Sequence, residues 1–315
     1  MNEKSIITNE KLISVDSFIK TSKKRIRSLV ISEKDTIIHE IYFHDEGFKK
    51  LHEMRSITKS VISTLIGIAI DQQLLTGVTQ TLREIFKNQT MSTDIGNITI
   101  KQLLTMTSGI QITDKELLSL ATKGNPMQKI FFANVHTAAP FSYKSIDPHL
   151  LSIILSHVTG KSAKQFGEEM LFSKLGIHTI HWPTDTLGHS IGSTGLSLSP
   201  RDLIKLGMLY LFGGEWNNTR ILSADWIHDT VSVHEKGLSK YGKYGYLWWI
   251  NSEKEYYNAA GFGGQYLYVY PKQEVTVVIT ADTTLPHDDT SEIFETFILP
   301  SLTNKTCGGG NLCMQ

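Results

Sequence analysis

The stretch "SITKSVISTLIGIAID", residues 56–71, begins with polar residues and continues as an apolar run without a polar face. A helix on a protein surface carries one apolar stripe, whereas a helix that is hydrophobic all round is buried in a core. We therefore expect residues 56–71 to form a helix at the centre of the molecule. Ser56 is expected at its amino end.

Ser56 and Lys59 stand three residues apart, so their side chains lie on one face of that helix. The positive end of a helix favours an anionic nucleophile, and a desolvated lysine can lose its proton near neutral pH and accept one from serine. The alternative is that Ser56 caps the helix and Lys59 reaches solvent. Ser17 and Lys20 repeat the spacing, so the apolar surroundings of Lys59 are what favour a nucleophile and its base.

Strand patterns occur at both ends of the chain. "IRSLVIS" and "TIIHEIYF" predict a hairpin near the amino end, and "YGYLWWI", "GQYLYVYP" and "EVTVVITAD" predict strands after Gly242. The middle is mainly helical, and "SEIFETFILPSL" predicts a closing helix. This order predicts an α/β protein of two lobes, in which both chain ends complete one antiparallel sheet and a helical lobe is inserted. We expect an extension over residues 1–24, one domain over 25–303 with its helical lobe at roughly 75–235, and a flexible tail over 304–315.

Composition narrows the function classes. Lysine plus arginine and aspartate plus glutamate each total 31, so no basic excess predicts a nucleic-acid partner, and the short "KKRIR" is expected to be a solvated face. No run of about 18 apolar residues predicts a membrane span. The first twenty residues lack a secretory core, and Cys307 and Cys313 in the tail are expected to be free thiols. We expect a soluble, cytoplasmic protein.

"GHSIG", residues 188–192, is a rival nucleophile motif, because it fits the G-x-S-x-G elbow with Ser190 as nucleophile. That elbow needs a buried strand before it and a helix after it. Here Pro183 interrupts the approach, and the exit "STGLSLSP" has no helical period. The context argues against Ser190, although candidate triad partners lie downstream: His228, His234, His287 and Asp282.

"SYKS", residues 142–145, places Tyr143 in a loop just before a predicted helix. A tyrosine beside a lysine can act as a general base, because the positive charge favours its phenolate. The alternative is a packing tyrosine with a hydrogen-bonded hydroxyl.

Read in order, these segments resemble the serine β-lactamase and penicillin-binding-protein superfamily, in the branch of class C β-lactamase-like esterases, amidases and D-peptidases. The resemblance covers roughly residues 25 to 300. It rests on the following segments: "SITKS", "QLLTMTSGI", "YKS", "STGLSLSPRDLIKLGMLYLFGG", "YGYLWWI" and "AAGFGGQYLYVYP".

The resemblance implies roles for particular residues. Ser56 would be the nucleophile, Lys59 its partner, and Tyr143 the hydroxyl that activates Ser56 and protonates the leaving group. Ser145 stands where the family usually carries asparagine in contact with substrate. The third family motif, on the inner strand, falls on three residues, Phe262, Gly263 and Gly264. The backbone N–H groups of Ser56 and Gln265 would form the oxyanion hole.

Phe262 departs from the family, which carries lysine or histidine there to hold a substrate carboxylate or stabilise charge. A phenyl ring does neither, unless another cation such as Arg201 or Lys243 reaches the cleft. We therefore expect a serine hydrolase for a neutral ester or amide of small size, with no metal or organic cofactor. A β-lactamase or D,D-peptidase, a non-catalytic binding protein of the same fold, and an acyltransferase remain open.

Overall fold

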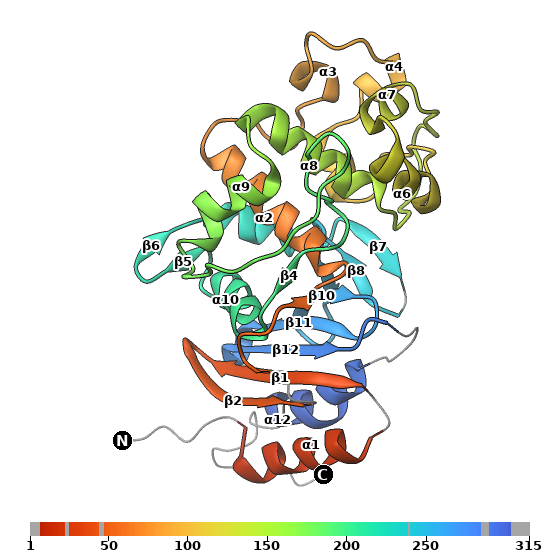
Figure 1. Cartoon of the computed structure of the whole chain (residues 1–315). Coiled ribbons are helices and arrows are strands. Elements are labelled where there is room, and N and C mark those ends of the chain that lie inside the picture. The colour runs from red at the N-terminus through yellow and green to blue at the C-terminus, as the bar shows by residue number, and fades with distance from the viewer. Residues whose placement is uncertain (1–6, 23–24, 44–46, 239, 285–289, 304–315) are drawn as a thin grey trace, which may run out of the picture.

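The computed structural model describes residues 7–22, 25–43, 47–238, 240–284 and 290–303. Its centre is an eight-stranded antiparallel sheet with the strand order β2-β1-β12-β11-β10-β9-β8-β7 (Figure 1). The strands are β1 (Ile26–Glu33), β2 (Thr36–Tyr42), β7 (Glu235–Leu238), β8 (Gly242–Tyr244), β9 (Trp249–Asn251), β10 (Tyr256–Gly261), β11 (Gln265–Tyr270) and β12 (Val275–Ala281).

The two ends of the chain meet in this sheet, which confirms the predicted α/β class. β1 pairs with β2 in the expected hairpin and with β12 on its other side. Lys34 turns the hairpin with a φ of 55°. β10 was not predicted as a separate strand, since "YYNAAG" contains no β-branched residue.

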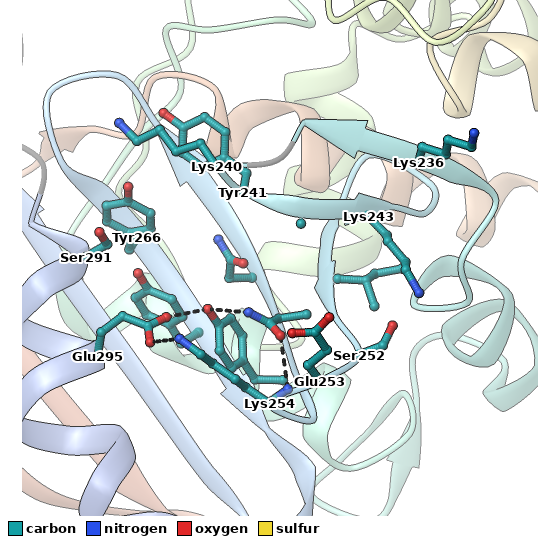
Figure 2. A pocket seen from close by; sticks show the side chains of 16 residues that line it. Lys236, Lys240, Tyr241, Lys243, Ser252, Glu253, Lys254, Tyr266, Ser291 and Glu295 are labelled. Atoms are coloured by element: carbon teal, nitrogen blue, oxygen red, sulfur yellow. Dashed lines mark hydrogen bonds and ion pairs between the residues drawn. The ribbon is translucent and has the colours of Figure 1, made fainter.

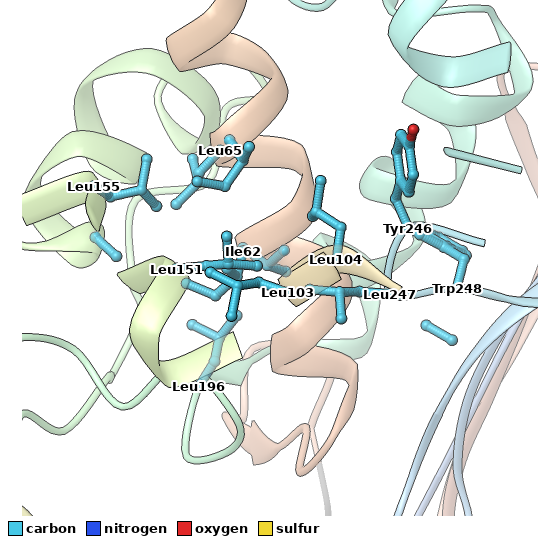
Figure 3. Close-up of a cluster of buried hydrophobic side chains, with 14 of the residues drawn as sticks. Ile62, Leu65, Leu103, Leu104, Leu151, Leu155, Leu196, Tyr246, Leu247 and Trp248 are labelled. Carbon is cyan, nitrogen blue, oxygen red and sulfur yellow. The ribbon is translucent and has the colours of Figure 1, made fainter. Parts of the chain in front are cut away.

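Helix α2 (Ile57–Asp71) is the predicted central helix, and residues 57–69 are all buried. Ile62 and Leu65 on α2 pack among leucines of neighbouring helices and the chain near Leu247 (Figure 3). The other helices of this part are α3 (Leu82–Ile85), α4 (Thr93–Gly96), α5 (Ile100–Leu104), α6 (Asp114–Lys123), α7 (Pro126–Phe131), α8 (Ile146–Thr159), α9 (Ala163–Gly167), the π-helix η1 (Glu168–Phe172) and α11 (Ala224–Thr230). In Figure 1, α3, α4, α6 and α7 gather at the end of the molecule away from β1 and β2.

Helix α10 (Pro200–Leu211) lies within the range predicted for the helical lobe but packs on the sheet, against β1, β11 and β12. Gly207 permits this contact, because a Cβ there would lie 2.3 Å from Thr276 Cγ2 and 2.8 Å from Leu267 Cδ1. Ser199 caps the helix at the predicted position by accepting from the Asp202 N–H. The remaining short elements are β3 (His52–Glu53), β4 (Ser197–Leu198), β5 (Glu215–Trp216), β6 (Thr219–Arg220) and the 3₁₀ turn η2 (Pro271–Gln273).

The opposite face of the sheet is covered by terminal helices: α1 (Asn9–Thr21), the π-helix η3 (Ile293–Ile298) and α12 (Leu299–Thr303). Val15 and Ile19 of α1 are buried with Phe294 and the outer side chains of β1, β11 and β12. Much of the predicted N-terminal extension is therefore part of the packed structure. The predicted tail, with Cys307 and Cys313, lies outside the described residues. Within the described ranges, no helix combines the length and apolarity needed to cross a membrane.

Candidate active site

The chain bends sharply just before α2. Arg55 has a φ of 49°, a left-handed conformation that non-glycine residues rarely adopt and that often occurs at functional sites. Ser56 follows at the amino end of the helix, and its side chain makes no capping hydrogen bond. Ser56 therefore occupies the N-cap position of α2, but its hydroxyl does not cap the helix.

Lys59 is turned into the protein, with 3% of its surface exposed. Its Nζ lies 2.9 Å from Ser56 Oγ and 2.9 Å from the Ser193 carbonyl oxygen. Burial lowers the pKa of Lys59 to about 7, and the negative charge of Asp114 opposes that shift. The alternative in which Lys59 reaches solvent is also wrong, and a large fraction of this amine is neutral near pH 7.

Tyr143 reaches the same point from the loop before α8. Its side chain lies close enough to Ser56 to interact with it, and Lys59 Nζ lies 4.9 Å from its ring centroid. The ring packs at 5.3 Å from Trp249, centroid to centroid. Burial raises the pKa of Tyr143 to about 12, partly opposed by its interaction with Ser56. Burial and the nearby negative charge of Asp114 both raise this pKa, so this environment favours the phenol form of Tyr143 over a phenolate.

Ser145 is the N-cap residue just before α8, and its backbone N–H donates to Asp114 Oδ1 at 3.0 Å. Asp114 comes from α6 and acts electrostatically on both Lys59 and Tyr143. Sequence reasoning missed this carboxylate, since nothing in the local pattern at the start of α6 separates it from an ordinary first-turn acid.

Phe262, Gly263 and Gly264 form the turn between β10 and β11, so their predicted place on an inner strand is wrong. Phe262 is 50% exposed, and the two glycines have φ values of 80° and 90°. Gln265 is fully buried, and its amide donates to the Ala281 carbonyl at 2.8 Å and to the Gly263 carbonyl at 3.3 Å. The Gln265 side chain therefore ties the turn to β12.

The strand segment beside Ser56 is the end of β10, residues 259–261. A Cβ on Gly261 would lie 2.4 Å from the Met54 carbonyl oxygen and 3.1 Å from Arg55 Cβ. Pairing of β10 with β9 stops at Asn258. The small residues of "AAG" allow β10 to approach the chain just before Ser56 this closely.

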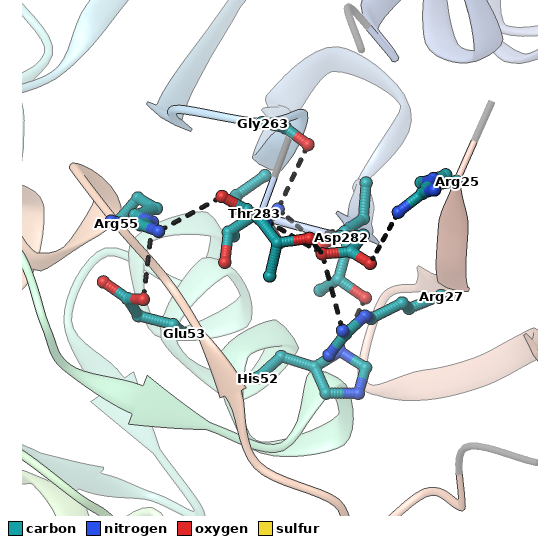
Figure 4. Close-up of polar contacts among 12 residues, drawn as sticks. Arg25, Arg27, His52, Glu53, Arg55, Gly263, Asp282 and Thr283 are labelled. Atoms are coloured by element: carbon teal, nitrogen blue, oxygen red, sulfur yellow. Dashed lines mark hydrogen bonds and ion pairs between the residues drawn. The ribbon is translucent and has the colours of Figure 1, made fainter. Parts of the chain in front are cut away.

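The cations considered from the sequence lie elsewhere. Arg201 pairs with Glu40 and stacks over Phe48. Lys243 lines a cavity of about 650 Å³ over β9, β10 and β11, to which none of Ser56, Lys59 and Tyr143 contributes (Figure 2). Arg55 adjoins Ser56, but its Nη2 donates to the Thr283 carbonyl and its Nε lies 3.4 Å from Glu53 Oε2 (Figure 4).

Ser190 does not form a nucleophile elbow. Its side chain is fully buried, its Oγ accepts from the Lys164 N–H at 3.0 Å, and it joins Thr184 in an isolated bridge rather than leading from a strand into a helix. Asp282, a possible triad partner, pairs with Arg25 and Arg27 (Figure 4).

Two of the other candidate triad partners have different surroundings, and the third is not described. The His228 side chain is 82% exposed, His234 stacks on Tyr246, and His287 lies outside the described residues. Ser17 is exposed and donates to the Ile13 carbonyl of its own helix. No group of three His, Cys, Asp or Glu side chains in the described part of the chain is placed to hold a metal ion.

Comparison with known proteins finds a family that matches most of this chain. The family model described as Beta-lactamase matches residues 29–296. A 6-aminohexanoate-dimer hydrolase from Paenarthrobacter ureafaciens is 26% identical over 149 residues, which are 44% of this chain and 38% of that protein. The match thus spans well under half of that relative.

Solved structures share the fold. A Bacillus anthracis protein proposed to be a 6-aminohexanoate-dimer hydrolase superposes with a TM-score of 0.77 at 22% identity, covering 90% of this chain and 80% of that one. A family VIII carboxylesterase gives a TM-score of 0.73 at 15% identity, with coverage of 93% and 98%.

Proposed function

The chain belongs to the β-lactamase family of hydrolases, and within it we propose a serine amidase or esterase that works through an acyl-enzyme on Ser56. The observation that carries the proposal is the contact of Ser56 Oγ with a buried Lys59 amine whose pKa is about 7. A neutral amine at this distance can take the serine proton at physiological pH.

In the proposed reaction, Ser56 Oγ attacks the acyl carbon while its proton passes to Lys59. The tetrahedral intermediate collapses when the bond to the leaving group breaks, and the Tyr143 phenol donates a proton to that group. Lys59 then returns its proton to Tyr143. Water attacks the ester on Ser56 in the second half, with the same residues moving protons in reverse order.

The oxyanion hole is proposed to use the Ser56 backbone N–H, which lies ahead of the first hydrogen bonds of α2. The second donor was expected at Gln265. We assign it instead to the edge of β10 at residues 259–261, since Gly261 is the residue in contact with Met54 and Arg55.

A neutral or apolar acyl substrate suits this site best. Neither Ala259 on β10 nor Phe262 in the turn carries a cation, and the Arg55 guanidinium is engaged by Thr283 and Glu53. A substrate carboxylate would lose its hydration without gaining a partner. The names of the relatives, an amide hydrolase and a carboxylesterase, support the amide and ester class.

The assembled group of Ser56, Lys59 and Tyr143 favours turnover over a binding role that keeps only the fold. Release of the acyl group to water rather than to another nucleophile is part of the proposal, as is a cytoplasmic location. β-Lactam or D,D-peptide cleavage is the competing activity, and its substrates carry the carboxylate that this site leaves unpaired.

Intact-mass spectrometry after exposure to a fluorophosphonate tests the proposal. We expect one phosphonyl adduct on the wild-type protein and on Ser190→Ala, and none on Ser56→Ala. Ser190→Ala should also keep most of its activity toward a p-nitrophenyl ester. Labelling that survives in Ser56→Ala and disappears in Ser190→Ala would reverse the assignment.

A further inference from the structure

We infer that two buried side chains on α8, His149 and Ser152, position the catalytic base by holding residues 190–193, whose Ser193 carbonyl fixes the Lys59 amine. The inference rests on the proposed function. It gives a role to "GHSIG", which is not a nucleophile elbow here.

Both α8 side chains contact this segment directly. Ser152 Oγ donates to the Ser190 carbonyl at 2.6 Å, and the Gly192 N–H donates to His149 Nδ1 at 3.4 Å. His149 and Ser152 are fully buried and stand three residues apart, so they present one polar face of the helix to residues 190–192. A buried hydroxyl and a buried imidazole need such partners.

Gly192 brings the segment against the start of α8. A Cβ at this position would lie 2.0 Å from the Pro148 carbonyl oxygen and 2.8 Å from His149 Cα. Only glycine permits this approach. The carbonyl oxygen of the next residue, Ser193, lies 2.9 Å from Lys59 Nζ. The position of Gly192 therefore determines where the Lys59 amine is held.

Asp185 lies on the other side of the imidazole. His149 Nε2 lies 3.4 Å from Asp185 Oδ2, and His189 Nδ1 lies 2.9 Å from the same oxygen. Burial would raise the pKa of Asp185, but hydrogen bonding to His149 and His189 outweighs it and holds that pKa below its usual range. Because Nδ1 accepts from Gly192, the Nε2 side of the ring is left facing the carboxylate.

The arrangement has a chemical consequence. A neutral lysine accepts the Ser56 proton only when its lone pair points at Ser56 Oγ. Donation of one Lys59 N–H to the Ser193 carbonyl removes most of the rotational freedom of the amine and leaves the lone pair in place. Helix α8 also begins directly after the loop that carries Tyr143. One helix therefore helps to position both the Lys59 amine and the Tyr143 hydroxyl.

Four variants test the inference in steady-state hydrolysis of a p-nitrophenyl ester over pH 5–9. We expect Ser152→Ala and His149→Ala each to lower kcat by about tenfold with KM nearly unchanged. His149→Asn keeps an acceptor for Gly192 and should recover at least about a third of the lost activity on a logarithmic scale. Ser156→Ala is the matched control, because Ser156 lies one turn along α8 and its hydroxyl donates only to the Ser152 carbonyl.

The pH profile separates positioning from stability. An ammonium at Lys59 loses stabilisation when the Ser193 carbonyl withdraws, so the acidic limb should move to lower pH in Ser152→Ala and His149→Ala. A ¹³C NMR titration of Lys59, assigned with Lys59→Met, should show the same change without turnover. Wild-type kcat and an unmoved Lys59 titration in both variants, or the same changes in Ser156→Ala, would overturn the inference.

Ser56→Ala, assayed alongside, keeps the two proposals apart. Activity that survives in this variant refutes the proposed function itself. An inactive Ser56→Ala with Ser152→Ala and His149→Ala like wild type refutes only the positioning role.

Discussion

Lys59 Nζ lies 2.9 Å from Ser56 Oγ in the first turn of a helix whose residues 57–69 are all buried. The same burial that makes the lysine a base also brings it close to the serine. Water is excluded from Nζ, so the charged form loses its hydration and the pKa falls to about 7. The negative charge of Asp114 raises this pKa, so its carboxylate adjusts how strong a base Lys59 is.

The pH dependence of activity should report Lys59. Activity needs the neutral amine, so kcat/KM should fall as the pH drops below about 7, the pKa of Lys59. Because the Asp114 charge raises that pKa, Asp114→Asn should move the acidic limb to lower pH. A limb that stays in place, or moves upward, would show that another group titrates there.

Lys59 and Tyr143 should act as one unit. Lys59→Ala and Tyr143→Phe should each lower kcat by about two to four orders of magnitude, the usual scale for removing a proton-transfer group. The phenylalanine keeps the ring packing against Trp249, so the loss isolates the hydroxyl. The double variant should lose far less than the sum of the single losses on a logarithmic scale. Full additivity would mean that one of the two residues acts elsewhere.

Substrate selectivity should reflect that Phe262 stands where related proteins carry a cation. An unpaired substrate carboxylate costs several kcal/mol, so kcat/KM for short neutral esters should exceed that for benzylpenicillin or a D-Ala-D-Ala peptide by at least about a hundredfold. Phe262 is half exposed in its turn, and Phe262→Lys should fold normally and narrow the gap by improving the anionic substrates. Equal efficiency of the wild type toward penicillins and esters would place β-lactamase activity first.

We expect the buried Lys59 to lower the free energy of unfolding. Its pKa in the folded protein, about 7, lies below the ordinary lysine value of 10.5, so folding opposes its protonation. This cost is full below pH 7 and disappears as the pH rises through 10.5. Lys59→Met should therefore be inactive yet melt a few degrees higher than wild type, with the largest gain at or below pH 7. An equal gain at pH 6 and pH 10 would contradict the shifted pKa.

Much of the fold could be predicted from local sequence patterns. The apolar run after Ser56 predicts a helix buried on all sides because a helix can satisfy its own backbone without water, and α2 is such a helix. The β-branched runs of β1 and β12 predict strands for the same local reason, and Ser199 with Pro200 marks the start of α10. Each of these signals depends on residues a few positions apart.

Tertiary structure decided what those residues can do. The contact of Lys59 with Ser193 joins positions far apart in the chain, and no spacing rule contains it. The raised pKa of Tyr143 and the lowered pKa of Lys59 both follow from which groups exclude water, which is a property of the packed molecule. The strand beside Ser56 ends at Gly261 rather than in the later glycine turn, because strand pairing and close backbone approach, not composition, determine which glycine meets the helix.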